Sequence, residues 1–177
     1  MKAPHDTAKW SCGITSACLV TPTKVYSFTE THTLGGVIKC EWYRFCEKKK
    51  LLPTHIQPLI PNITRLKFIG DSNELIASLS RNFGCRLSIH NSPEFGYGKE
   101  VLYVEMQHYK PIETKKDWMI VKGKFYEQVR ECIQLFSDQL PEQLSNLVCD
   151  DLGINNVAFD NDQLILLDPV YATTGHK

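Results

Sequence analysis

The hydrophobic and polar positions of the chain alternate in short runs through its first half and form one long helical stripe later. Two runs rich in β-branched and aromatic residues, 10–20 and 24–29, flank the turn at 21–23 and predict an antiparallel pair. Two further runs, 62–69 and 100–107, have the lengths and residue types of strands. The pattern therefore predicts an antiparallel sheet in the N-terminal part of the chain.

Three stretches have the 3.6-residue period of an amphipathic helix. The first, 37–50, follows a capping residue, Thr33, and ends in a basic run that suits the helix dipole. The second lies in the segment 71–98, which we interpret as an insertion that ends in a loop. The third, 124–140, has the clearest apolar stripe and stops at Pro141.

Two short apolar runs near the end of the chain, 156–159 and 164–167, flank acidic and amide residues typical of a turn and predict a β-hairpin. Folding on that turn brings Asn156 and Asp168 to one edge, and Asp151 lies on the incoming loop. Carboxylate and amide oxygens are the ligands that Mg²⁺ takes, and substrate phosphates and water usually complete its shell. The pattern predicts a cation site at the open end of the hairpin. The alternative is that these are ordinary loop residues.

This stretch resembles the catalytic and metal-binding segment of protein kinases, in which Asp-x-x-x-x-Asn is followed by a short hairpin and a buried strand that ends in Asp. The ending Leu-Asp-Pro-Val, in place of Asp-Phe-Gly, is most similar to that of the small bacteriophage serine/threonine kinases of the T7 type. By this resemblance Asp151 is the catalytic base, and Asn156 and Asp168 hold Mg²⁺. Two positions depart from the family, because Cys149 stands at its His and Gly153 at its usual Lys or His.

The resemblance covers about residues 10–170 and implies an α+β fold, namely a minimal bilobal protein-kinase-like structure. Residues 1–108 are then the N-lobe, an antiparallel sheet with one helix that corresponds to the kinase helix αC. Residues 109–177 are a reduced, mostly helical C-lobe that carries the catalytic and metal hairpin at 149–170. The specific motifs lie only in this final stretch.

The nucleotide-binding features of the N-lobe are weaker. Gly13 is the only glycine in the first turn, so the phosphate loop is reduced to the backbone and hydroxyl donors of the turn, and a plain hairpin turn is the alternative. By resemblance, backbone groups near Glu105 and Gln107 bond the adenine edge; otherwise these residues belong to a buried strand and a turn. Glu41 corresponds to the αC glutamate, or else it is a solvated surface residue.

The phosphate-binding lysine of the kinase strand is the main departure. Aligning the run 24–29 with that strand puts Ser27 at the lysine position, so that Lys24 or Lys39 would have to substitute for it. A second alignment takes 37–40 as the strand, but it leaves the αC glutamate too close in sequence to be the partner. The sequence favours the first alignment.

The chain has 20 basic and 20 acidic side chains, so its formal net charge of zero favours neither a nucleic acid nor a membrane surface as partner. Its seven cysteines are scattered without Cys-x-x-Cys pairs, and the N-terminus has no apolar stretch typical of a signal peptide. No apolar run approaches the roughly 18 residues of a membrane-spanning helix. We expect a cytoplasmic protein, in the host cell if a phage encodes it.

The resemblance implies an ATP- and Mg²⁺-dependent phosphotransferase that acts on Ser or Thr of host proteins. The missing glycines and Ser27 leave an alternative, a pseudokinase that binds and modulates a host partner protein without efficient phosphoryl transfer. Phosphorylation of a small molecule, as in the aminoglycoside kinases, shares the metal motif and is a third interpretation.

Overall fold

The computed structural model describes most of the chain, namely residues 8–13, 15–87 and 100–173. The chain forms two compact units, each made from two separate segments: 1–40 with 63–108, and 41–62 with 109–177. The predicted N-lobe, 1–108, ends at one of these boundaries. However, residues 41–62 group with the second unit, whereas the prediction placed them in the N-lobe.

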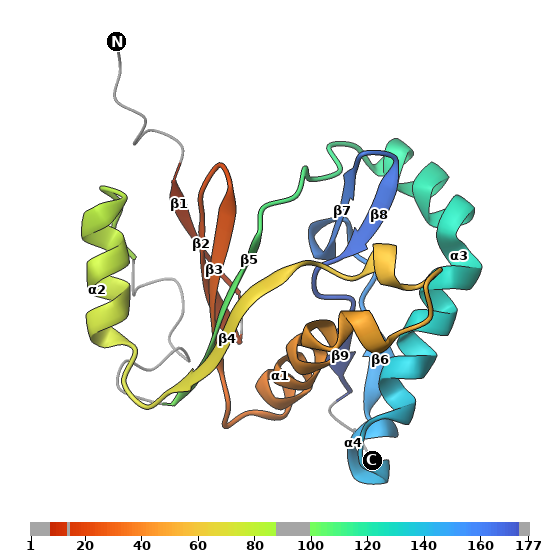
Figure 1. Cartoon of the computed structure of the whole chain (residues 1–177), viewed down its shortest axis with the longest axis horizontal. Helices are drawn as coiled ribbons and strands as arrows, with labels where there is room; N and C mark the ends of the chain where they lie inside the picture. Colours follow the sequence, from red (N-terminus) through yellow and green to blue (C-terminus); the bar gives the residue numbers. More distant parts are fainter. Residues whose placement is uncertain (1–7, 14, 88–99, 174–177) are drawn as a thin grey trace. The chain divides into compact units, whose positions relative to one another are not determined.

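The first unit is built on a five-stranded antiparallel sheet with the strand order β1-β2-β3-β5-β4 (Figure 1). The predicted antiparallel sheet is therefore confirmed. The apolar run 10–20 forms two strands, because the chain turns at Gly13, whose N–H donates to the carbonyl of Ser16 at 2.8 Å. The strands are β1 (Lys9–Cys12), β2 (Ser16–Val20), β3 (Lys24–Glu30), β4 (Ile63–Ile69) and β5 (Val101–Gln107).

Helix α2 (Asn73–Asn82) covers one face of this sheet (Figure 1). Its buried side chains Ile76 and Leu79 share a core with strand residues that include Phe28, whose ring centroid lies 5.2 Å from that of Tyr103. The described part of the segment 71–98, for which the sequence predicts an insertion, thus contributes to the core of the first unit. Its residues 88–99 lie outside the described part of the chain.

Helix α1 (Leu34–Glu47) follows β3 and contributes residues to both units. It begins before the predicted 37–50, because Thr33 caps it by accepting the N–H of Gly36 at 3.1 Å. A β-carbon at Gly36 would lie 2.2 Å from the carbonyl oxygen of Glu30, so only glycine allows this close approach of helix and strand. The predicted basic end of the helix continues instead into a short 3₁₀ turn, η2 (Lys49–Leu51).

The second unit is organised on the long helix α3 (Lys115–Asp138). The helix begins well before the predicted 124–140, because Thr114 accepts the N–H of Asp117 at 3.1 Å and so caps an earlier first turn. Trp118 and Val121, both buried, extend the apolar stripe through that turn. A short helix, α4 (Glu142–Ser145), follows. Within the described residues, no helix has the length and apolar character needed to cross a membrane.

Three aromatic side chains explain why residues 41–62 belong to the second unit. The ring of Phe136 on α3 lies with its centroid 5.4 Å from that of Trp42 and 5.6 Å from that of Phe45. Trp42 is fully buried, and its indole N–H donates to the carbonyl of Leu167 at 3.2 Å. The segment also includes the short 3₁₀ turn η3 (Gln57–Leu59), which contacts β8.

Two small antiparallel pairs complete the second unit, which is less helical than predicted. Strand β6 (Val148–Asp150) pairs with β9 (Val170–Ala172), and β7 (Val157–Asp160) pairs with β8 (Gln163–Leu166). The predicted hairpin is confirmed. Asn161 and Asp162 connect β7 to β8 with φ of 49° and 61°, the left-handed conformation that tight hairpin turns require.

Candidate functional site

The loop that carries Asp151 is fixed at its beginning by the pair β6 and β9. Asp150 lies opposite Val170 in that pair, and the next N–H, that of Asp151, donates to the carbonyl of Pro169 at 2.6 Å. Pro169 follows Asp168 directly. The backbone thus holds the loop beside the end of the acid-terminated strand.

Asn156 connects the loop to the hairpin. Its carbonyl oxygen accepts the N–H groups of Leu167 at 2.9 Å and of Asp168 at 3.1 Å, which closes the open end of the hairpin. Its side-chain Nδ2 donates to the carbonyl of Asp151 at 3.0 Å. The structure therefore brings together Asp151, Asn156 and Asp168, the three residues from which the sequence predicts a cation site.

The donor groups of these residues suit a hard cation such as Mg²⁺. The amide nitrogen of Asn156 is used by the backbone, which leaves Oδ1 to accept or to ligate. Asp151 is exposed and Asp168 is half-buried, so a hydrated ion can reach both residues from solvent. Nowhere in the described residues do three His, Cys, Asp or Glu side chains gather into a cation site, so the candidate set is two carboxylates and one amide.

Gly153 and Cys149 are the two positions near the hairpin that depart from the kinase pattern. A β-carbon at Gly153 would lie 3.6 Å from both Asn156 Nδ2 and Asp151 Oδ1, so the glycine stands directly beside the candidate residues. Cys149 lies opposite Tyr171 in the pair of β6 and β9 and is half-buried. It also lines a pocket of about 380 Å³ together with Arg130 and other residues of α3.

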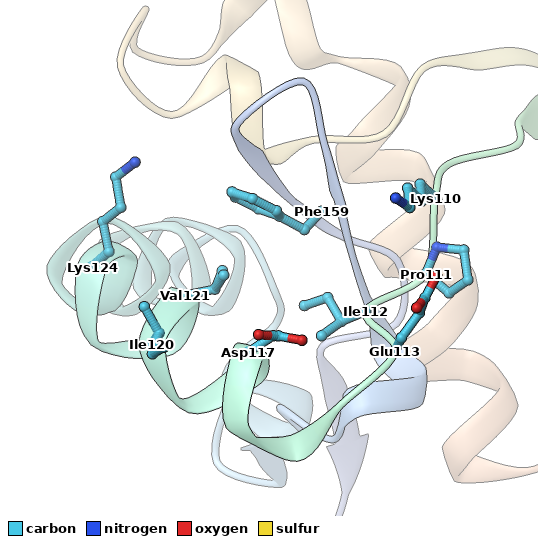
Figure 2. Close-up of a pocket in the computed structure, with 9 residues that line it drawn as sticks. All are labelled: Lys110, Pro111, Ile112, Glu113, Asp117, Ile120, Val121, Lys124 and Phe159. Carbon is cyan, nitrogen blue, oxygen red and sulfur yellow. The ribbon is translucent and has the colours of Figure 1, made fainter.

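A second pocket of the unit, of about 420 Å³, does not include the three candidate residues. Its floor is apolar and its rim is charged. Figure 2 shows Phe159 of β7 above Ile112, with Lys110 and Lys124 to either side and acidic side chains at the opposite rim. Sequence reasoning missed this pocket. Its only local signal is Ile120, which lies on the polar face of α3 and is 64% exposed.

Ser27, at the predicted lysine position, lies within the sheet of the first unit. It is fully buried, and its Oγ lies 3.4 Å from Thr29 Oγ1 and 3.4 Å from Cys18 Sγ. This side chain belongs to a polar network of the sheet. Gly13 lies in the β1–β2 turn, as predicted. A phosphate-binding turn and a plain hairpin turn are both compatible with this position.

Lys39 and Glu41 both lie on α1, so the alignment that made 37–40 a strand is wrong. Lys39 Nζ donates to Ser16 Oγ at 2.9 Å. Glu41 pairs with Arg44 at 2.7 Å, one turn along the same helix. Glu41 therefore forms an ion pair at the helix surface, which agrees with the alternative that it is a solvated surface residue. It belongs to the second unit.

Glu105 lies in the interior strand β5, which pairs with β3 on one side and β4 on the other. Its carbonyl accepts the hydroxyl of Thr64 at 3.2 Å. The predicted contact with adenine would therefore need backbone groups of residues that follow β5. Its carboxylate accepts the Tyr103 hydroxyl at 2.8 Å. Burial acts against ionisation, but hydrogen bonds from Tyr103 and Lys24 lower the pKa of Glu105. Gln107, the last residue of β5, lies opposite Lys24.

The chain was compared with models of protein families, with curated proteins and with solved structures. None of these comparisons finds a match. The resemblance to protein kinases therefore stays a prediction from the sequence between Asp151 and Asp168.

Proposed function

We propose that the protein is an ATP- and Mg²⁺-dependent phosphotransferase that phosphorylates Ser or Thr of host proteins in the cytoplasm. Asp151 would be the base, and Asn156 and Asp168 would hold Mg²⁺. The observation that supports the proposal is the hydrogen bonding of Asn156, which joins the loop residue Asp151 to the strand end at Asp168.

The order of the elements also supports a protein-kinase-like fold. An antiparallel sheet comes first, with helix α1 directly after its third strand, and the long helix α3 precedes the loop that carries Asp151. The hairpin β7–β8 then separates the two proposed metal ligands. A bilobal kinase-like structure is the fold that we propose on this basis.

The proposed chemistry follows from the positions of the oxygen atoms. Bound Mg²⁺ would neutralise charge on the nucleotide phosphates. Asn156 contributes the amide oxygen that its hydrogen bond to the loop leaves available, and Asp168 contributes a carboxylate. The exposed carboxylate of Asp151, on a loop fixed by the Pro169 carbonyl, would orient an acceptor hydroxyl and take its proton.

The experiment compares Asp168→Ala and Asp151→Ala with the wild type. We expect Mg²⁺·ATP at about 100 times its Kd to stabilise the wild type by roughly 2.7 kcal/mol, measured by thermal shift. Asp168→Ala should lose the Mg²⁺-dependent part of this stabilisation, because a charged ligand is gone. Asp151→Ala should bind nucleotide nearly as well but transfer no ³²P from [γ-³²P]ATP to proteins of a bacterial lysate.

Asp162→Gly is the matched control, since Asp162 is an exposed acid at the far end of the same hairpin, in a conformation that glycine accepts. It should keep both nucleotide binding and transfer. An unchanged Mg²⁺·ATP shift in Asp168→Ala would refute the metal assignment. Loss of nucleotide binding in a folded Asp151→Ala variant would give that residue another role.

A partner-binding pseudokinase is the second candidate, and the 420 Å³ pocket beside Ile120 favours it. Apolar side chains exposed around a pocket are typical of a surface that binds another molecule. This function predicts that the wild type shows no ³²P transfer to any lysate protein. It also predicts that Ile120→Glu abolishes binding of the host partner while the Mg²⁺·ATP thermal shift stays unchanged.

A further inference from the structure

The first half of helix α3 and the segment before it carry a charge opposite to the one that helix stability favours. Residues 110–126 contain five lysines and two acids, a net charge of +3, whereas 127–138 contain three acids and one arginine. The helix dipole favours acids near the N-terminal end and bases near the C-terminal end. The acid of the first turn, Asp117, accepts the hydroxyl of the capping residue Thr114 at 2.6 Å. The stability of the helix therefore does not account for the lysines.

Neighbouring acids do not neutralise these lysines. Within the described part of the chain, no lysine of 110–126 forms an ion pair with a carboxylate. Lys122 lies 6.0 Å from the ring centroid of Trp118, and Lys124 lies 5.2 Å from that of Phe125, contacts that leave the positive charge in place. The other three lysines are all exposed, namely Lys110, Lys115 and Lys116.

Large apolar side chains are exposed among these lysines. Met119 is 67% exposed, Ile120 64% and Tyr126 51%, and they make up half of the six large exposed apolar side chains in the described residues. Ile120 also lines the pocket of about 420 Å³, together with Phe159 of β7 (Figure 2). Exposed apolar side chains that gather at a pocket with a charged rim are typical of a surface that binds another protein.

Gly123 keeps the space beside these side chains open. It lies one turn from Met119 and Ile120 on α3, because residues three and four positions apart are neighbours on a helix. A glycine inside a helix lowers its stability, yet a β-carbon at Gly123 would meet no atom of the described residues within 4 Å. Packing within that part of the protein therefore does not require the glycine. Its missing side chain allows the backbone of a partner to approach α3 closely.

We propose that the surface made of Lys110, Ile120, Gly123, Lys124 and Phe159 binds a segment of a partner protein in which a large apolar side chain lies next to Asp or Glu residues. The apolar side chain would occupy the pocket, and the lysines at its rim complement the acids of the segment. The inference goes beyond the proposed function, because it gives the chemistry of the partner and holds whether the protein transfers phosphate to that partner or only binds it.

The surface suits a protein segment better than a nucleic acid or an anionic membrane. Nucleic acids bind mainly through their phosphates, which the acids Glu113 and Asp117 at the rim of the pocket would repel. The same two acids would repel an anionic membrane, and a bilayer surface does not fill a pocket. An acidic segment with an apolar side chain satisfies both the lysines and the pocket.

The test selects peptides that bind the wild-type protein from a random library displayed on filamentous phage. One selected peptide, labelled with fluorescein, is then measured by fluorescence polarisation. We expect the selected sequences to have a negative net charge and to place Asp or Glu beside a large apolar side chain. Added salt should weaken the binding of the peptide, because salt screens exposed charges.

Two variants test the surface itself, and thermal unfolding checks that each is folded. Ile120→Glu puts a negative charge at the pocket and should weaken binding of the peptide about 10- to 100-fold, the usual effect at a central interface residue. Gly123→Gln should also weaken binding, because its side chain fills the space that the partner needs, although it raises the helix propensity. Leu51→Glu is the matched control, since Leu51 is 83% exposed in the same unit but does not line the pocket; it should bind as the wild type does.

Three results would overturn the inference. A library that yields no enriched sequence, or only sequences without acids, would refute the chemistry of the partner. Equal binding of the peptide to Ile120→Glu, or to folded Gly123→Gln, would place its site elsewhere. Binding of oligo(dT) or of phosphatidylserine vesicles that Ile120→Glu abolishes, without binding of any peptide, would identify a nucleic-acid or membrane surface. None of these results affects the phosphotransferase proposal, which depends on the separate loss of Mg²⁺·ATP stabilisation in Asp168→Ala.

Discussion

Replacing Asn156 by alanine should affect folding and ligand binding to very different extents. The substitution removes the hydrogen bond from Nδ2 to the carbonyl of Asp151. It keeps the backbone bonds from the N–H groups of Leu167 and Asp168 to the carbonyl of residue 156. Because Asp151 is exposed, water can replace the lost donor. We expect a loss of about 1 kcal/mol in the free energy of unfolding, or a fall in Tm of about 2–4 °C.

The ligand-linked effect should be larger. At a Mg²⁺·ATP concentration of about 100 times Kd, the wild type gains roughly 2.7 kcal/mol from binding. If Asn156 Oδ1 ligates Mg²⁺, the variant should lose most of that gain while its urea unfolding stays cooperative. The predicted outcome is therefore a small change in Tm without ligand and the loss of a shift of several degrees with it.

Thermal unfolding with and without Mg²⁺·ATP, together with urea titration, separates these two effects. Asn155→Ala is the matched control, since Asn155 is an exposed residue of the same 3₁₀ turn, η5 (Ile154–Asn156). The control should keep the full ligand shift. If Asn156→Ala also keeps it, Asn156 is not a metal ligand; if Asn156→Ala fails to fold, the backbone bonds alone do not hold the hairpin as we reason.

The remaining predictions concern packing within the two units. Gly36→Ala should destabilise the protein by about 1–3 kcal/mol in urea titration, because the new β-carbon would lie 2.2 Å from the Glu30 carbonyl oxygen. Gly123 lies inside the helix α3, and a β-carbon there would have no neighbouring atom within 4 Å. Gly123→Ala should therefore stabilise the protein by up to about 1 kcal/mol. Burial raises the pKa of Cys132 from 9.0 to about 12, so iodoacetamide at pH 8.5 should label this thiol only after unfolding. Because the folded state keeps the proton, the contribution of Cys132 to stability is complete below the unfolded-state pKa near 9 and decreases as the pH rises toward 12. An unchanged urea midpoint for Gly36→Ala would contradict the close approach of helix and strand at that residue. Labelling of Cys132 in the native protein would contradict its burial.

The parts of the structure that the sequence predicted correctly are those with local causes. The hairpin follows from two apolar runs around a turn, and the close approach of Asn156 and Asp168 follows from the hairpin. Thr33 was likewise identified as a cap from sequence alone. In each case the interacting residues are close in the sequence or are related by one turn, so that a simple pattern determines the outcome.

The errors come from interactions between distant segments. Nothing in the sequence around Trp42 indicates that it packs on Phe136, which determines the unit to which residues 41–62 belong. The position of the Lys39 ammonium depends on which strand the helix faces. A single sequence does not contain that information in any local pattern.

The second unit is assembled from segments that the chain makes at different times, because residues 63–108 of the first unit lie between them. Phe136 cannot complete its aromatic cluster with Trp42 and Phe45 until the loop of about 90 residues between Phe45 and Phe136 has closed, which costs roughly 4 kcal/mol in chain entropy. A fragment that begins at Tyr109 would therefore lack two of the three rings of this cluster. During synthesis, the segment 41–62 must wait for the C-terminal part of the chain before its apolar side chains can be buried.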